Sequence, residues 1–208
     1  MIILDFGSGN SCKNDWNIAK RMIDSLAEID PLRKAIIKWQ LFKEAIPNIP
    51  LLRSIFTMAE NYACVQYGYM TTASVFDLDS LKFLLTFNIP FVKIPNRRDL
   101  DWLMGEVIRK IPVIRSIGKP TEETMDMLSS GASSLCCVSK YPAEDKDYED
   151  FFPLMQLKYG ISDHTTDWTL YRKYHPGIYE CHFVLEHDSN NPDGGSFART
   201  PKMIREIL

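Results

Sequence analysis

Short apolar segments alternate with amphipathic segments along the chain of 208 residues. The short segments lack strict alternation of apolar and polar positions, which is typical of parallel strands buried on both faces. The segments predicted to form strands are Ile2–Phe6, Ala35–Gln40, Tyr67–Ser74, Phe91–Ile94, Pro112–Ser116, Ser134–Val138, Gly160–Asp163 and Ile178–Val184.

The segments between them have the spacing of amphipathic helices. Apolar residues recur at intervals of three and four from Leu100 to Ile108, and again from Ile18 to Leu26. Residues that favour helix starts mark further boundaries. Such starts are predicted at Asp77 before Leu81–Leu85, at Thr121 before Glu122 and Glu123, and at Thr200-Pro201 before Met203–Leu208.

Eight strands that each precede a helix form the pattern of a (β/α)8 barrel. A chain of 208 residues lies near the lower size limit of about 200 for this fold, so we expect one compact TIM-barrel domain over residues 1–208. An open doubly wound sheet is the alternative. That fold would carry a glycine-rich turn after the first strand, and Gly7-Ser8-Gly9 lacks the third glycine.

Composition narrows the class of protein. A net charge of -3 argues against a general affinity for nucleic acid, which needs a basic face. No apolar run approaches the ~20 residues that span a bilayer, and the amino terminus does not resemble a signal peptide. The 5 cysteines are odd in number and include no C-x-x-C pair. We therefore expect a cytoplasmic protein with reduced thiols.

Two lysines stand out because each lies inside an apolar strand segment, Lys38 in AIIKWQ and Lys93 in FVKI. A buried lysine is costly unless it is paired or meets an anion. Two converging lysines together with strand-end hydroxyls would bind a phosphate and a carboxylate. The alternative is that a lysine pairs with a barrel carboxylate, such as Asp5 or Glu180, for structure alone.

Two histidines, His164 and His182, end the last two predicted strands. Neutral imidazoles are common ligands of divalent metals, and two protein ligands leave positions open for water and substrate. We interpret the pair as a candidate metal site at the mouth of the barrel. The alternative is a pair of hydrogen-bonded core histidines. His175 and His187 are expected to be solvated.

Several segments, in this order, resemble the N-acetylneuraminate (sialic acid) synthase family. They are DFGSGN, IIKWQ, TTASVFD, IPFVKIPNRRDL, PVIRSIGKPTEETM, CCVSKYPAE, GISDHTTD and ECHFVLEHDSNNPDGG. The resemblance implies an enzyme that condenses phosphoenolpyruvate with an aldehyde or aldose acceptor and releases phosphate. It also implies a homodimer, although the family dimerises partly through a C-terminal antifreeze-like domain that this sequence lacks.

The resemblance also implies roles for individual residues. The phosphoenolpyruvate-binding positions are Lys38, Ser74, Lys93, Asn96, Ser116, Ser139 and Ser162. His164 and His182 match the metal-binding histidines, usually occupied by Mn2+. Positions that handle the sugar and the reacting carbonyl are Asp5, Tyr141, Glu180 and Asp193, of which Asp5, Tyr141 and Glu180 are the catalytic candidates.

The sequence departs from the family at several of these motifs. Asp5 replaces a glutamate, Asn96 replaces a serine, and Gly194 replaces the histidine after Asp193. Ile117, Lys119 and Ser11 also differ from the family residues. Two other functions therefore stay open: a barrel that binds an anion or sugar as a scaffold without turnover, and a metal-dependent lyase or hydrolase acting on a phosphorylated sugar.

Overall fold

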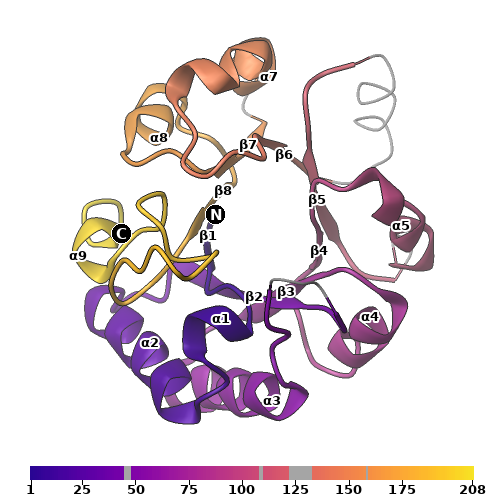
Figure 1. Ribbon diagram of the computed structural model, residues 1–208, viewed down its shortest axis with the longest axis vertical. Coiled ribbons are helices and arrows are strands. Elements are labelled where there is room, and N and C mark those ends of the chain that lie inside the picture. Colours follow the sequence, from indigo (N-terminus) through magenta and orange to yellow (C-terminus); the bar gives the residue numbers. More distant parts are fainter. Residues whose placement is uncertain (45–47, 108–109, 122–132, 158) are drawn as a thin grey trace.

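The computed structural model describes residues 1–44, 48–107, 110–121, 133–157 and 159–208. Eight parallel strands close into a barrel in the order β1 to β8 (Figure 1). Their bounds are β1 Ile2–Asp5, β2 Ala35–Leu41, β3 Thr71–Val75, β4 Val92–Ile94, β5 Val113–Ile117, β6 Ser133–Cys137, β7 Gly160–Asp163 and β8 Tyr179–His182. β1 pairs with both β2 and β8, which closes the barrel and excludes the open sheet.

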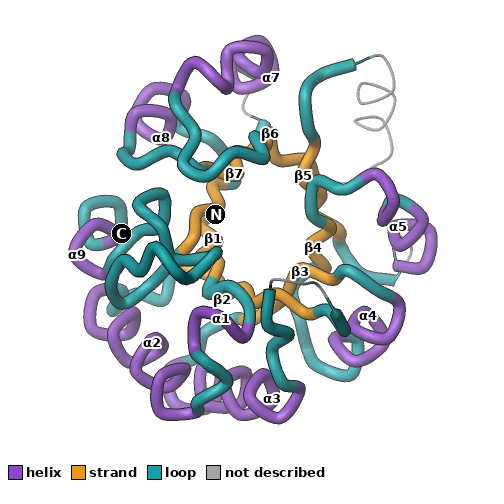
Figure 2. Tube along the Cα trace, in the orientation of Figure 1, coloured by secondary structure: helices purple, strands orange, loops and turns teal. Residues whose placement is uncertain are grey.

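The helices form a ring outside the strands (Figure 2). The α-helices are α1 Gly9–Cys12, α2 Trp16–Ile29, α3 Arg53–Tyr62, α4 Leu78–Leu84, α5 Trp102–Val107, α7 Phe152–Gln156, α8 Thr169–Tyr174 and α9 Pro201–Ile204. Shorter elements are the π-helix η1 Ala63–Tyr67 and the 3-10 helices η2 Arg98–Leu100 and η3 Asp145–Phe151. The prediction of a (β/α)8 barrel is confirmed.

Two of the predicted helix starts are confirmed, although one of these two helices ends earlier than predicted. Asp77 caps α4, and its Oδ1 atom accepts a hydrogen bond of 2.8 Å from the backbone N–H of Ser80. Thr200 precedes Pro201 at the start of α9, but this helix ends at Ile204 instead of reaching Leu208. The predicted start at Thr121 leads into residues 122–132, which lie outside the described residues, as does Ile108.

The predicted third strand begins too early. Tyr67 belongs to the π-helix η1, and β3 begins only at Thr71. Gly68 ends η1 with a positive φ of 77°, a backbone conformation that favours glycine, and its N–H donates to the Cys64 carbonyl at 2.8 Å. The aromatic residues there suggest a strand, but the glycine terminates a helix and turns the chain into the barrel.

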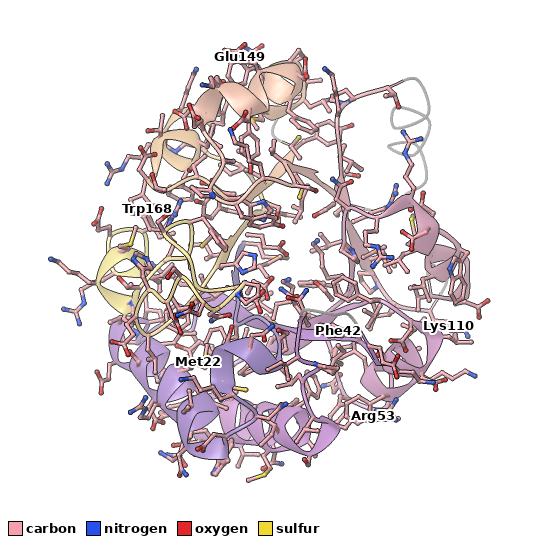
Figure 3. All side chains as sticks on the ribbon, in the orientation of Figure 1. Met22, Phe42, Arg53, Lys110, Glu149 and Trp168 are labelled. Carbon is pink, nitrogen blue, oxygen red and sulfur yellow. The ribbon has the colours of Figure 1, made fainter. Side chains whose placement is uncertain are left out.

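Apolar residues fill the barrel at the amino-terminal end of its strands. Ile3, Ile36, Phe91, Ile114 and Leu135 pack together there and are at most 3% exposed. A larger apolar layer lies between the strands and the helices, and it includes Met22 on the inner face of α2 (Figure 3). Because these five residues fill the amino-terminal end of the barrel, the polar side chains inside the barrel lie at its carboxyl end. No described helix is long and apolar enough to cross a membrane.

Candidate active site

A cavity of about 340 Å³ opens at the carboxyl ends of the strands. The structure places every predicted site residue around it. These are Asp5, Lys38, Ser74, Lys93, Asn96, Ser116, Ser139, Tyr141, Ser162, His164, Glu180, His182 and Asp193. They come from all eight strands or from the loops that follow them, because parallel strands bring their carboxyl ends to one face of a barrel.

The bottom of the cavity holds a lysine–carboxylate cluster of Lys38, Lys93, Asp5 and Glu180. Lys38 Nζ donates to Asp5 Oδ2 at 2.7 Å and to Ser74 Oγ at 2.8 Å. Glu180 lies between the lysines, with carboxylate oxygens 3.7 Å from Lys38 Nζ and 3.6 Å from Lys93 Nζ. Both lysines are 2% exposed. The two lysines therefore converge, and each also has a carboxylate beside it.

The cluster fixes the charge states of its members. Burial alone would lower the pKa of Lys38, but the Asp5 and Glu180 carboxylates outweigh burial and raise it. For Lys93, burial prevails over Glu180, and the pKa lies below its ordinary value. Burial would raise the pKa of both carboxyl groups, but the lysines lower the pKa of Asp5 and of Glu180. Both carboxyl groups are therefore ionised at neutral pH.

Hydroxyl groups line the same end of the cavity. Ser116 Oγ accepts a 2.7 Å hydrogen bond from Lys93 Nζ, and Ser162 Oγ donates to Glu180 Oε1 at 2.9 Å. Both serines are buried. Asn96 and Ser139 lie higher, where Asn96 Nδ2 donates to Ser139 Oγ at 3.2 Å and Ser139 is exposed. The hydroxyls thus divide into buried ones bonded to the lysine–carboxylate cluster and the exposed Ser139 hydroxyl at the rim.

The histidine pair lies beside the cluster, with ring centroids 5.6 Å apart. His164 Nδ1 is 2.6 Å from the Val138 carbonyl oxygen, which requires a proton on Nδ1 and leaves Nε2 as the acceptor. Burial lowers the pKa of His164 to about 3, so the ring is neutral at physiological pH. His182 Nδ1 is buried and has no hydrogen-bond partner among the described residues. His164 Nε2 and His182 Nδ1 are thus available to a ligand.

These two nitrogens suit a divalent metal, and His164 has the arrangement common among metal ligands, a neutral imidazole oriented by a carbonyl on its other nitrogen. The described residues contain no group of three or more His, Cys, Asp or Glu arranged to hold a metal. A metal held by His164 and His182 would therefore keep positions for water and substrate. Tyr141 packs over His164 with ring centroids 4.2 Å apart and is 51% exposed.

Asp193 joins the loop after β8 to the loop after β1. Its Oδ2 atom accepts hydrogen bonds from the backbone N–H and the hydroxyl of Ser8, both at 2.9 Å. Gln40 Nε2 donates to Asp5 Oδ2 at 3.0 Å and to Asp193 Oδ1 at 3.2 Å. A Cβ atom on Gly7 would lie 2.7 Å from the Asp193 carboxylate, so only glycine fits there. The loops are thus connected before any substrate binds.

The cavity also contains residues that the sequence did not single out as site residues. They are Gln40, Asn48, Phe76, Pro95, Arg97, Cys137 and Pro192. Gln40 is the polar last residue of the predicted strand Ala35–Gln40, and Cys137 lies within the predicted strand Ser134–Val138. Asn48, Arg97 and Pro192 lie in loops and carry no periodic signal. His175 and His187 are exposed, in agreement with the sequence prediction.

The fold and the cavity define a (β/α)8 barrel with paired charges and two histidines at its carboxyl mouth. Residues 54–208 match the NeuB family, and the chain belongs to that family. The predicted resemblance to sialic acid synthases is thereby confirmed. The chain is 32% identical over 94 residues to N-acetylneuraminate-9-phosphate synthase of Drosophila melanogaster, which covers 40% of this chain and 25% of that protein. The match thus spans about a quarter of the relative's length.

Solved structures show the same fold over 99% of the chain. A sialic acid synthetase from Leptospira borgpetersenii, determined with citrate, is 22% identical with a TM-score of 0.81, and 80% of it is covered. The spore coat polysaccharide biosynthesis protein SpsE of Bacillus subtilis is 20% identical with a TM-score of 0.79 and 65% covered. DAHP synthase of Thermotoga maritima is 12% identical with a TM-score of 0.70 and 66% covered.

Proposed function

We propose that this barrel catalyses a phosphoenolpyruvate-dependent C–C condensation with an aldehyde or aldose acceptor and releases phosphate. The observation that carries the proposal is the convergence of Lys38 and Lys93 on one cavity, 3.7 and 3.6 Å from the same Glu180 carboxylate. Membership of the NeuB family supports it, as do relatives named sialic acid synthetase and N-acetylneuraminate-9-phosphate synthase.

Phosphoenolpyruvate carries a carboxylate and a phosphate, which require cationic and neutral donors. Lys38 and Lys93 supply the cations, while buried Ser116 and Ser162 supply hydroxyl groups at the same depth. The two lysines already face two carboxylates, Asp5 and Glu180. Binding the anion therefore requires that the lysine ammonium groups be shared between it and those carboxylates. This competition favours a substrate with two anionic groups over one with a single group.

In the proposed reaction, C3 of the enol attacks the carbonyl carbon of the acceptor, and the carbonyl oxygen takes up a proton. Water then adds at C2, and the C–O bond to phosphate breaks, which leaves a ketone at C2 and free phosphate. Asp5 and Glu180 are ionised, so either can accept the proton of the attacking water. The exposed rim, with Asn96, Ser139 and Tyr141, faces the acceptor.

Metal assistance is part of the same proposal. His164 and His182 would hold the ion, most suitably Mn2+, through nitrogens that the protein leaves without other partners among the described residues. A bound divalent ion supplies Lewis-acid polarisation of the acceptor oxygen. Lys38 Nζ remains bonded to Asp5, which lies 3.8 Å from His182 Nε2 and so connects the two halves of the cavity.

The test is phosphate release from phosphoenolpyruvate with Mn2+ and a panel of aldoses, with Lys93→Met and His164→Ala as variants. We expect release with at least one aldose, and loss of release in both variants. No release with any acceptor, together with unchanged metal content in His164→Ala, would overturn both the reaction and the metal assignment.

Two further outcomes separate the alternatives. Calorimetric binding of phosphoenolpyruvate without turnover would identify a binding or scaffold module. Consumption of a phosphorylated sugar without consumption of phosphoenolpyruvate would identify a lyase or hydrolase. Cytoplasmic location and a homodimer stay predictions, and sedimentation of the purified protein measures the second.

A further inference from the structure

The end of β7 carries two site residues, Ser162 and His164, on either side of Asp163. β7 pairs with β6 as far as the register Cys137↔Ser162. The backbone N–H of Ile161 donates to the Ile178 carbonyl on the β8 side at 2.9 Å. Because backbone groups of a strand alternate between its two neighbours, the Ser162 carbonyl and the His164 N–H face the β6 side. Because Cys137 is in register with Ser162, the following residue on the β6 side, Val138, is the one opposite Asp163.

A tyrosine hydroxyl bonds to both of these backbone groups. Tyr148 lies in η3, its side chain is fully buried, and its hydroxyl donates to the Ser162 carbonyl at 2.7 Å. The same oxygen accepts a hydrogen bond from the His164 N–H at 3.1 Å. In a regular parallel pair, one residue of the neighbouring strand would make both bonds. Tyr148 thus takes the position that Val138 would fill if β6 continued.

This replacement frees the Val138 carbonyl for another partner. Its oxygen lies 2.6 Å from His164 Nδ1, the contact that orients the imidazole and sets its tautomer. Ser162, on the other side of Asp163, donates its hydroxyl to Glu180 of the lysine–carboxylate cluster at 2.9 Å. Burial raises the pKa of Tyr148 well above its usual value, so the hydroxyl stays protonated and able to donate.

We infer that Tyr148 is a positioning residue that sets the depth of both Ser162 and His164 in the cavity. It touches neither the cavity nor its contents, and it acts through two backbone groups. The inference rests on the proposed function only for the consequence that positioning affects turnover. Removal of the hydroxyl would leave two buried backbone groups without this partner and would let the end of β7 move relative to β6.

The test compares Tyr148→Phe with Tyr69→Phe. Tyr69 is also buried, at 1% exposure, and its hydroxyl donates to the Asp30 carbonyl at 3.3 Å, outside the cavity. Hydrogen exchange of the His164 amide and the ring 15N shifts of His164 are measured by NMR in the metal-free protein. We expect Tyr148→Phe to speed exchange of the His164 amide about 10-fold or more and to move its ring shifts. Tyr69→Phe should change neither.

The affinity for Mn2+ provides a second measurement. Loss of a residue that orients a metal ligand typically weakens metal affinity or activity about 10–100-fold, so Tyr148→Phe should weaken Mn2+ binding by that range. Unchanged His164 exchange and ring shifts would overturn the inference. These signals need no turnover, so they stay informative if the wild-type protein releases no phosphate, a result that concerns only the proposed function. If Tyr148→Phe does not fold, 3-fluorotyrosine at position 148 should shift the His164 amide proton, and an unshifted proton would overturn the inference.

Discussion

The bottom of the cavity and its rim differ in how firmly the protein holds their side chains. At the bottom, Lys38 and Lys93 are 2% exposed, and ion pairs or hydroxyl contacts fix their Nζ atoms. At the rim, Tyr141 is 51% exposed, and Ser139 is exposed with one 3.2 Å contact to Asn96. Buried charges are costly unless they are paired, so the bottom must be organised before substrate arrives. The rim has no such requirement.

Departures from the sialic acid synthase pattern occur in both regions. The lysine–carboxylate cluster keeps both lysines and Glu180 but has Asp5 in place of a glutamate, and toward the rim Asn96 replaces a serine. A change at the rim costs little stability, since exposed side chains contribute little to folding. Because the cluster keeps its paired charges and the rim is free to change, we propose that the common substrate binds at the bottom of the cavity and that the choice of acceptor depends on the rim. The following predictions test that division.

The largest effect is expected from Lys38→Met. This change leaves Asp5 and Glu180 buried near one remaining lysine, and breaking a buried ion pair typically costs about 3–5 kcal/mol. We expect a loss of that order in the free energy of unfolding, measured by urea denaturation. Lys43→Met is the matched control because Lys43 pairs with Asp79 at the surface, where an ion pair contributes about 0–1 kcal/mol. Equal losses in the two variants would contradict the comparison.

The next effect concerns the metal half of the cavity. His182→Ala removes one of two imidazoles, so Mn2+ affinity should fall at least about 10-fold, while phosphoenolpyruvate affinity in metal-free protein stays within about 3-fold. Calorimetry measures both values. His175→Ala, which changes an exposed histidine, is the control. A parallel loss of both affinities in His182→Ala would show that the two halves of the cavity are one site.

A pH dependence of stability follows from the burial of His164. Its folded-state pKa is about 3, whereas an unfolded histidine titrates near 6.5. Between these values the unfolded chain binds more protons, so stability falls as pH falls. Metal-free protein should lose on the order of 1–2 kcal/mol between pH 7 and pH 5 relative to His164→Gln. Urea midpoints at the two pH values measure this, and identical pH profiles for the two proteins would refute it.

The sequence predicts the bottom of the cavity better than the contacts that hold it. Lys38 and Lys93 are conspicuous because a charge interrupts an apolar strand, a local signal that any buried lysine produces. Ser8 and Asp193 bond across 185 residues of chain, and no local pattern connects such positions. Tyr148 belongs to a short 3-10 helix without apolar periodicity, so its bonds to β7 are visible only in three dimensions.

Element boundaries show the same limit. The run from Tyr67 predicts a strand because aromatic residues favour strands, yet the chain uses Tyr67 in a π-helix and begins β3 at Thr71. Tyr67 donates its hydroxyl to Asp24 of α2 at 2.8 Å, a tertiary contact that outweighs local propensity. β7 has the predicted bounds, Gly160–Asp163, and the other strands except β3 differ from their predicted bounds by one or two residues at an end.

The smallest effect compares one serine from each region. Ser116→Ala removes a buried acceptor from Lys93 Nζ, and an unsatisfied buried group costs about 1–3 kcal/mol. Ser139→Ala removes an exposed hydroxyl, so the free energy of unfolding should change by less than about 0.5 kcal/mol. Ser139→Ala should nevertheless alter the ratio of kcat/KM between two aldose acceptors, whereas Ser116→Ala should lower both values together. If Ser116→Ala changes that ratio and Ser139→Ala does not, acceptor selection lies at the bottom of the cavity.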